Sequence, residues 1–227
     1  MTATPTTGRR LPAKEATTSL ILVRHGHVPG IAPQRFRGRA EFELTALGIQ
    51  QARAAASRIA RECRPSIVYT SPLRRCVETG RLIAKASGVR SRVLEGLNDL
   101  DYGRWQGKTH AYVRKRWPVE YERWKTFPDL IRFPSGESLQ DLALRVSDVL
   151  RELLARREGD TAVLVGHDAS IRALLLQALG MPLGAYWRIQ QDPAAISELD
   201  CEGGRISVRR LNDTAHLAGL GPALPKT

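Results

Sequence analysis

Short apolar segments alternate with long amphipathic ones along this chain, and this alternation limits the folds it can adopt. Three short segments are dominated by apolar residues and bounded by polar ones: SLILV (19–23), SIVYT (66–70) and TAVLVG (161–166). They are too short for buried helices and predict buried strands. Apolar residues at helical spacing follow each of them, at 44–64, 73–87 and 170–180. We therefore predict an α/β fold, a three-layer sandwich with a mostly parallel central sheet and helices on both faces.

The remaining segments indicate a helical cap and a sheet edge. Two short helices are expected within 108–127, interrupted at Pro118, as part of a small helical cap region at about 108–135. The clearest helix covers 136–157, where apolar residues recur along one side. Near the end of the chain, AAISELD and RISVRRL flank EGG, which is typical of a hairpin at a sheet edge.

The length of the chain indicates one domain between two tails. A chain of 227 residues can bury a single large core, and we place the domain at 19–212, with a flexible N-terminal tail at 1–18 and a C-terminal tail at 213–227. The N-terminal segment lacks the continuous apolar stretch of a signal peptide. No segment approaches the length of a membrane span. We expect a cytoplasmic protein that does not interact with membranes, and its oligomeric state, a homo-oligomer included, stays open.

Charge and cysteine content narrow the classes of partner. Lys and Arg number 35 against 23 Asp and Glu, a formal net charge of +12. The basic residues are spread along the chain, and the densest cluster is RKR at 114–116. A nucleic-acid interface concentrates basic residues and interleaves them with aromatics, so we expect small anionic molecules, and not nucleic acid, as partners. Cys63, Cys76 and Cys201 show neither a disulfide pattern nor the paired spacing of a metal site.

Polar side chains stand directly after all three predicted strands. The sequences at these points are VRHG, YTSPLRR and VGHD. Ligands of parallel sheets bind beyond the carboxyl ends of the strands. The three strand ends therefore bring Arg24, His25, either Arg74 or Arg75, and His167 toward what could be one pocket.

These residue types suit phosphoryl transfer. The planar guanidinium groups of Arg24 and Arg75 can bind phosphate oxygens in pairs. The imidazole of His25 can attack phosphorus and form a phosphohistidine. A second, protonated imidazole at His167 would stabilise charge on the transferred group. Asp99, in the loop LNDLDYGRWQG, is the candidate that protonates the leaving group and then activates water.

Six segments in order resemble the histidine phosphatase superfamily, in the branch that holds the cofactor-dependent phosphoglycerate mutases. They are VRHG, ELTALGIQQA, TSPLRRCVETG, LNDLDYGRWQG, PSGES and VGHDASIR. The resemblance covers about 19–210. It implies the α/β sandwich with its cap, a phosphoryl-transfer activity, and neither cofactor nor metal.

The resemblance also implies roles for individual residues. The family's nucleophile falls on His25 and its preceding arginine on Arg24. The second phosphate-binding arginine falls on Arg75 and the second histidine on His167. The family's proton donor falls on Asp99, where Glu is usual, so the shorter side chain must come closer or act through water. Asp101, two residues on, is the alternative donor.

Three further positions depart from the family pattern. Thr and Asn residues that help to hold the phosphate are replaced by Val28 and Ile31. Arg35, where the family often keeps an arginine, is the expected substitute in phosphate binding. Asp168 stands where the family often has Gly. A carboxylate facing the pocket would repel a dianion, so we expect Asp168 to turn away and to bond with the backbone or an arginine.

Several functions are consistent with these residues. A metal site at His25 and His27 would need a third ligand at compact spacing, and none is visible. A mutase grips its substrate with a paired arginine, which the stretch YERWKTFPDLIRF lacks. We therefore predict a metal-independent phosphomonoesterase acting on a small phosphorylated metabolite. The alternatives are a phosphoglycerate mutase-type phosphotransferase and a non-catalytic binder of phosphorylated ligands.

Overall fold

The computed structural model describes residues 17–29, 34–156 and 159–220. Its six-stranded sheet has the strand order β3-β2-β4-β1-β5-β6. The strands are β1 (Thr18–Arg24), β2 (Ile67–Thr70), β3 (Arg90–Val93), β4 (Thr161–Gly166), β5 (Ile196–Glu202) and β6 (Arg205–Asp213). Strands β1 to β4 pair in parallel, and β5 and β6 form the antiparallel edge. The mostly parallel sheet and the terminal hairpin are as predicted.

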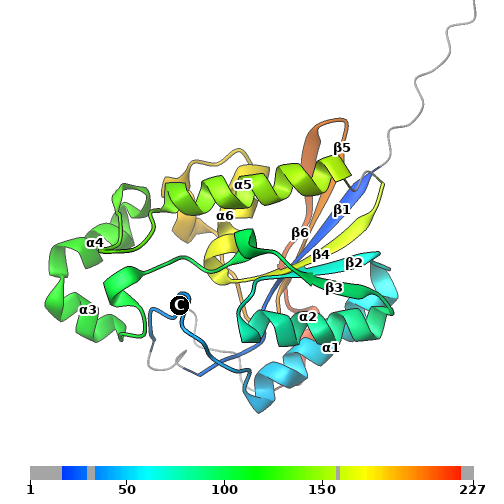
Figure 1. Ribbon diagram of the computed structural model, residues 1–227, viewed down its shortest axis with the longest axis horizontal. Helices are drawn as coiled ribbons and strands as arrows, with labels where there is room; N and C mark the ends of the chain where they lie inside the picture. The colour runs from blue at the N-terminus through cyan, green and yellow to red at the C-terminus, as the bar shows by residue number, and fades with distance from the viewer. Residues whose placement is uncertain (1–16, 30–33, 157–158, 221–227) are drawn as a thin grey trace, which may run out of the picture.

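Helices cover both faces of this sheet (Figure 1). They are α1 (Ala46–Glu62), α2 (Arg74–Ser87), α3 (His110–Arg116), α4 (Pro118–Thr126), α5 (Leu139–Arg156) and α6 (Asp168–Ala178). Helices α1 and α2 lie on one side of the sheet, and α5 and α6 lie on the other. A hydrophobic core lies on each face of the sheet, and strand β1 contributes to both. Leu20 and Leu22 pack into one core, and Ile21 and Val23 pack into the other. The three-layer sandwich is confirmed.

Local signals in the sequence explain where the helices begin and end. The Thr45 side chain accepts a hydrogen bond from the Gly48 amide and caps α1. Helix α2 ends at Gly88, whose φ of 68° suits glycine. Pro118 is the first residue of α4, a position where its missing amide hydrogen is not needed, so it separates α3 from α4.

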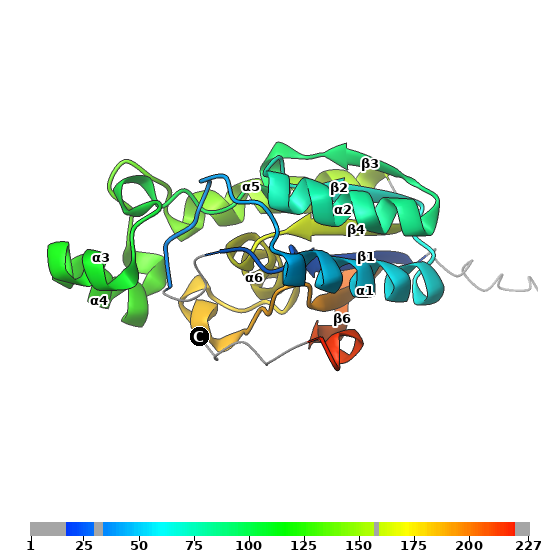
Figure 2. The same ribbon diagram turned by 90° about the horizontal axis from the view of Figure 1, so that it is seen from below.

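Helices α3 and α4 form a cap beyond the carboxyl ends of the parallel strands (Figure 2). Aromatic side chains hold it to the body. The rings of Trp105 and Phe133 lie 5.1 Å apart, and those of Trp124 and Trp187 lie 4.9 Å apart. Trp105 and Trp124 are almost fully buried. The cap is therefore packed firmly enough to form a wall over the strand ends.

Most of the expected tails lie outside the described residues. Thr18 belongs to β1, and 213–220 include the short 3-10 helix Ala215–Leu217.

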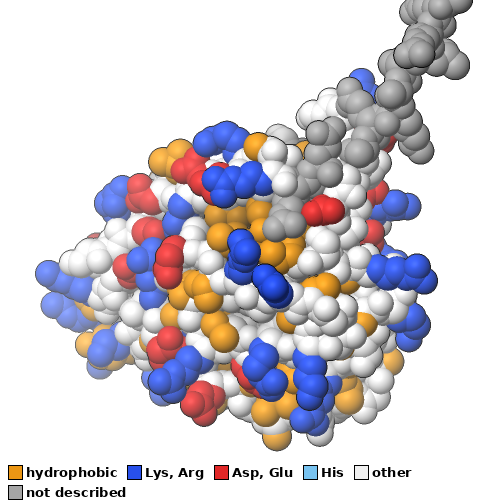
Figure 3. All heavy atoms as spheres, turned by 45° about the vertical axis from the view of Figure 1, so that its right-hand side comes forward, with side chains coloured by type: hydrophobic (Ala, Val, Ile, Leu, Met, Phe, Trp, Pro, Cys, Tyr) orange, Lys and Arg blue, Asp and Glu red, His pale blue; other side chains and the backbone are white. Residues whose placement is uncertain are grey.

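In the part of the chain that the structure describes, no helix is both long and apolar enough to cross a membrane. On the face shown in Figure 3, Lys and Arg side chains are scattered among acidic and hydrophobic ones.

A close backbone contact fixes the loop after β1 against the start of α1. A Cβ atom at Gly26 would lie 2.3 Å from the Gly48 carbonyl oxygen, and a Cβ atom at Gly48 would lie 2.1 Å from the His27 carbonyl oxygen. The Thr45 amide also donates to the His27 carbonyl. Glycine at both positions therefore allows the loop that carries His25 to lie directly on the helix.

We predict that Gly48→Ala destabilises the protein by about 1–3 kcal/mol, because the added methyl group forces two packed backbones apart. Urea unfolding measures the change. Gln50→Ala, an exposed position in the same helical turn, is the matched control and should change stability by less than about 0.5 kcal/mol. Equal stability of the two variants would contradict the close contact.

Candidate active site

The ends of β1, β2 and β4 bring the predicted residues into one place. His25 follows β1 and its amide donates to the Gly166 carbonyl at the end of β4. His167 is the N-cap of α6. The rings of the two histidines are 5.3 Å apart between centroids, at an angle of 62°. The convergence expected from the strand ends is present in the structure.

The protonation of His25 can be read from its hydrogen bond. Its Nδ1 lies 2.7 Å from the Gly26 carbonyl oxygen, which can only accept, so Nδ1 carries the hydrogen. The Nε2 lone pair is then free. Burial, and next the positive charges of Arg75 and Arg24, hold the pKa of His25 well below its ordinary value. The ring is neutral near pH 7, as a nucleophile requires.

Two hydrogen bonds, one accepted and one donated, hold the His167 ring. Arg75 Nε donates to His167 Nδ1 at 3.3 Å, so Nε2 bears the hydrogen and donates to Ser71 Oγ at 2.7 Å. Burial and the charge of Arg75 hold the pKa of His167 well below its ordinary value. The ring is therefore neutral in this structure. Its protonation beside a phosphate dianion, whose charge would raise the pKa, stays a prediction.

Arg75 is fully buried and donates to four groups from three segments of the chain. Its guanidinium donates to the carbonyls of Gly38 (2.6 Å) and Ala40 (2.8 Å), to His167, and to Asp99 Oδ2 (3.2 Å). Arg74, the neighbour, points outward to Glu43. Between the two candidates at the start of α2, the structure thus places Arg75 in the site.

Arg24 approaches the site from the end of β1. Its Nη1 donates to the Gln191 carbonyl, and its Nε has no hydrogen-bond partner among the described residues. The residue is only 6% exposed. Arg24 therefore brings a buried guanidinium to the site, and its Nε–H group is available to donate a hydrogen bond.

Of the two candidate proton donors, Asp99 lies in the site and Asp101 beside it. Asp99 Oδ2 is 3.6 Å from His167 Nδ1. Burial raises the pKa of Asp99, although the charge of Arg75 opposes this. Asp101 instead accepts from the Gly103 amide and faces Arg39. The Asp99 carboxylate also accepts a hydrogen bond from Arg75 Nη2 at 3.2 Å.

Arg37 is a site residue that the sequence analysis did not single out. Its charge is among the causes that lower the pKa of His25. Burial, and next the charge of Arg24, lower the pKa of Arg37 itself to about 10, so it stays protonated. Arg35, the expected phosphate-binding residue, lines the cavity but is exposed and donates to the Gly107 carbonyl.

The other positions that depart from the family pattern are Val28, Ile31 and Asp168, and the structure agrees only in part with what we expected of them. Val28 is fully buried and offers no polar contact, while Ile31 lies outside the described residues. Asp168 does bond an arginine, with Oδ1 3.2 Å from Arg172 Nη2. It does not turn away, however, because it lines the cavity and its charge helps to raise the pKa of Asp99.

The structure adds further residues to the site, and the sequence pointed to some of them and not to others. Ser71 follows β2 within the segment YTSPLRR, so the strand-end rule could have found it. Cys76 Sγ lies 3.4 Å from His167 Nε2, and burial raises the pKa of its thiol well above the ordinary value. Nothing in the spacing of the cysteines indicated this. Arg37 had no signal, because it stands in a loop without regular structure.

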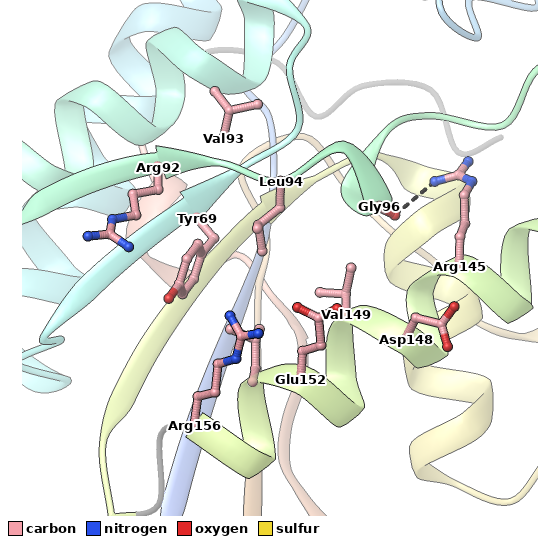
Figure 4. A pocket seen from close by; sticks show the side chains of 11 residues that line it. Tyr69, Arg92, Val93, Leu94, Gly96, Arg145, Asp148, Val149, Glu152 and Arg156 are labelled. Carbon is pink, nitrogen blue, oxygen red and sulfur yellow. Dashed lines mark hydrogen bonds between the residues drawn. The ribbon is translucent and has the colours of Figure 1, made fainter.

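A cavity of about 270 Å³ leads to these groups. Its walls include Arg24, Arg37 and Asp99 from the site, and Trp124 and Lys125 from the cap. A second cavity of about 520 Å³ lies between β3 and α5 (Figure 4). Its lining contains neither Arg24 nor Asp99. We assign the chemistry to the smaller cavity, because Arg24 and Asp99 line it and Asp99 Oδ2 lies 3.6 Å from His167 Nδ1, although neither histidine is part of its lining.

His27 does not pair with His25 as a metal ligand would. Its Nδ1 lies 2.9 Å from Thr45 Oγ1, at the start of α1. Within the described ranges, no group of three or more His, Cys, Asp or Glu side chains could hold a metal ion. The contacts of His27 instead join the loop to the helix.

Known proteins share both the sequence pattern and the fold. The model of the histidine phosphatase superfamily (branch 1) matches residues 20–214. "Phosphoserine phosphatase 1" of Hydrogenobacter thermophilus is 32% identical over 87% of this chain and 93% of that protein. "Probable phosphoglycerate mutase GpmB" of an Enterobacter species is 35% identical over 79% of this chain and 83% of that protein.

Among solved structures, a mycobacterial glucosyl-3-phosphoglycerate phosphatase superposes with a TM-score of 0.80 at 27% identity, covering 87% of this chain and all of the other. The family match spans most of the chain and includes every residue of the site described above. The chain therefore belongs to the histidine phosphatase superfamily, branch 1, and is a phosphatase-type hydrolase of that family.

Proposed function

We propose that the protein hydrolyses the phosphate monoester of a small metabolite through a phosphohistidine on His25. The observation that carries this proposal is the neutral His25 ring, whose Nε2 is unprotonated and which lies beside His167 and the guanidinium groups of Arg24 and Arg75. An unprotonated nitrogen can attack phosphorus, and guanidinium groups bind the phosphate oxygens.

In the first step, His25 Nε2 attacks phosphorus while the bond to the ester oxygen breaks. Arg24, Arg75 and Arg37 hold the equatorial oxygens, and His167 takes up charge as its pKa rises beside the dianion. Asp99 donates its proton to the leaving oxygen and releases an alcohol. Burial of Asp99 favours this step, because it keeps the carboxyl protonated to a higher pH.

In the second step, water attacks the phosphohistidine. The Asp99 carboxylate accepts a proton from this water, the P–N bond breaks, and inorganic phosphate leaves with His25 restored. Arginine side chains supply the positive charge throughout, so the proposed mechanism uses neither a metal ion nor a cofactor. Arg35 remains a proposed contact to the substrate at the rim of the cavity.

A cavity of about 270 Å³ beside the site supports a small substrate. Relatives are named for phosphoserine and phosphoglycerate, so these esters are the first to assay. One relative is named as a mutase. The alternative function is therefore transfer of the phosphate between two positions of one substrate. Release of inorganic phosphate without isomerised product favours hydrolysis, and binding without turnover favours a non-catalytic receptor.

We predict that His25→Ala lowers kcat for p-nitrophenyl phosphate on the order of a thousandfold or more, because the attacking nitrogen is lost. Phosphate release measures the rate, and circular dichroism checks the fold. His216→Ala, which removes a histidine outside the site, is the control and should keep its rate. A folded His25→Ala variant with normal turnover would remove His25 from the mechanism.

We predict that Asp99→Asn slows hydrolysis of alkyl phosphates by about a hundredfold or more, because alkoxides leave poorly without a proton. The loss for p-nitrophenyl phosphate should be smaller, since its leaving group is already stable as an anion. In the unmodified protein, kcat/KM for alkyl phosphates should fall as rising pH ionises Asp99, and the variant should lack this fall.

Asp101→Asn is the matched control for this prediction. Its carboxyl group lies outside the cavity lining, so it should keep the same dependence on the leaving group as the unmodified protein. The assignment fails if Asp101→Asn, and not Asp99→Asn, discriminates between alkyl and aryl esters.

A further inference from the structure

Two residues outside the catalytic cavity hold the Asp99 loop, residues 96–101. Arg145 lies on α5, and Glu137 lies just before this helix, in the segment PSGES. Neither residue lines the catalytic cavity, and the proposed reaction gives no role to either of them. Both side chains are mostly buried, with 19% of Arg145 and 17% of Glu137 exposed. Their contacts therefore belong to the interior of the protein and not to its solvated surface.

The guanidinium of Arg145 uses all five of its N–H groups on the Asp99 loop and on Glu137. Nη1 donates to the carbonyls of Gly96 (2.9 Å, Figure 4) and Asn98 (2.7 Å), and Nη2 donates to the Asp99 carbonyl (2.8 Å). Nε and the second Nη2 hydrogen bond to the two carboxylate oxygens of Glu137, each at 3.0 Å. A guanidinium has five donors in fixed directions. One rigid group therefore fixes the positions of three carbonyls in the loop.

Glu137 holds the end of the same loop. Its Oε2 accepts from the Asp101 amide at 3.0 Å, and its own amide donates to the Asp101 carbonyl at 2.9 Å. Its Oε1 also accepts from Arg39 Nη2 at 2.6 Å. Burial alone would raise the pKa of Glu137, but the hydrogen bonds and the charge of Arg145 outweigh burial and hold this pKa below its ordinary value. Glu137 is therefore ionised near pH 7 and compensates the buried charge of Arg145.

The Asp99 loop also packs tightly against α5. A Cβ atom at Gly96 would lie 2.4 Å from Val149 Cγ2 and 3.3 Å from the Arg145 carbonyl oxygen. Three residues later, the Asp99 carbonyl accepts from Arg145, while the Asp99 carboxyl group accepts from Arg75 in the catalytic site. The backbone of Asp99 is thus held from the side of α5, and its side chain reaches into the site.

We propose that Arg145 and Glu137 are positioning residues for proton transfer, because they set where the Asp99 carboxyl group meets the leaving oxygen. This inference rests on the proposed function, in which Asp99 is the acid. An acid must lie within hydrogen-bond reach of the oxygen that it protonates, and a displacement of about 1 Å can cost about a hundredfold in rate. A lysine side chain has the same charge as arginine but only three donors and no planar fork, so it cannot make the five bonds of Arg145.

The test compares two esters of similar shape whose leaving groups differ in basicity, phenyl phosphate and p-nitrophenyl phosphate. Phenolate is the poorer leaving group without a proton, so its ester depends more on the acid. We expect Arg145→Lys to lower kcat/KM about tenfold for phenyl phosphate and less than about threefold for p-nitrophenyl phosphate. The inhibition constant of inorganic phosphate should change by less than about twofold, because Arg145 lies outside the cavity.

A double variant separates positioning from a general loss of structure. Asp99→Asn already removes the acid, so adding Arg145→Lys to it should lower kcat/KM for phenyl phosphate by less than about a further twofold. Losses that multiply in the double variant would overturn the inference, because Arg145 would then act independently of Asp99. The inference is also overturned if Arg145→Lys changes kcat/KM for both esters by the same factor, or for neither.

Arg151→Lys is the matched control. Arg151 lies on the same helix and pairs with Asp148 at the surface, at 2.8 Å, so kcat/KM for both esters should not change. An equal loss for phenyl phosphate in Arg151→Lys and Arg145→Lys would contradict the inference. Glu137→Gln keeps the shape of its side chain and should discriminate between the esters in the same direction, so it carries the test if Arg145→Lys does not fold.

Hydrogen–deuterium exchange separates this inference from the proposed reaction. The amides of 96–101 should exchange about tenfold faster in Arg145→Lys than in Arg151→Lys, with the rest of the chain unchanged. That result would support the hold of Arg145 on the loop even if Asp99→Asn did not discriminate between leaving groups, in which case the proposed acid is wrong. Equal exchange in the two variants, while Asp99→Asn does discriminate, would overturn the inference and leave the proposed reaction intact.

Discussion

The buried guanidinium of Arg75 is the interaction on which the arrangement of the site depends. A buried charge is tolerated only when its donors are satisfied. Arg75 meets this need with groups from three separate segments: two carbonyls of the loop before α1, Asp99, and His167. Removing any of these partners would leave a buried charge less well compensated. The site is therefore held together by the same residue that we propose binds phosphate.

The cationic surroundings also set the reactivity of the histidines. Together with burial, neighbouring arginines lower the pKa of His25 and of His167, which favours the neutral His25 ring that the proposed mechanism needs. A phosphate dianion compensates the same positive charges. Burial acts on Asp99 in the opposite sense, because it raises the pKa of a carboxyl group. Burial among arginines thus favours both the neutral His25 and the protonated Asp99 that the proposed mechanism requires.

Regular elements and strand-end residues could be predicted from the sequence, whereas loop geometry could not. The spacing of apolar residues and the caps at Thr45 and Gly88 are local features, set by residues close together in the sequence. They therefore indicate strands and helices without knowledge of the fold. His25 and His167 followed from the rule on strand ends, which left Arg74 and Arg75 open until the family resemblance pointed to Arg75. Arg37 and the direction of Asp168 depend on how loops pack against distant segments, which no local pattern encodes.

The most direct test of the proposed mechanism is to trap the phosphorylated intermediate. The enzyme is mixed with substrate, quenched rapidly in base, digested and analysed by mass spectrometry. The account predicts a phosphoryl group on His25 that is stable in base and lost in acid. Phosphate on another residue, or none at any time or pH while turnover proceeds, would contradict it.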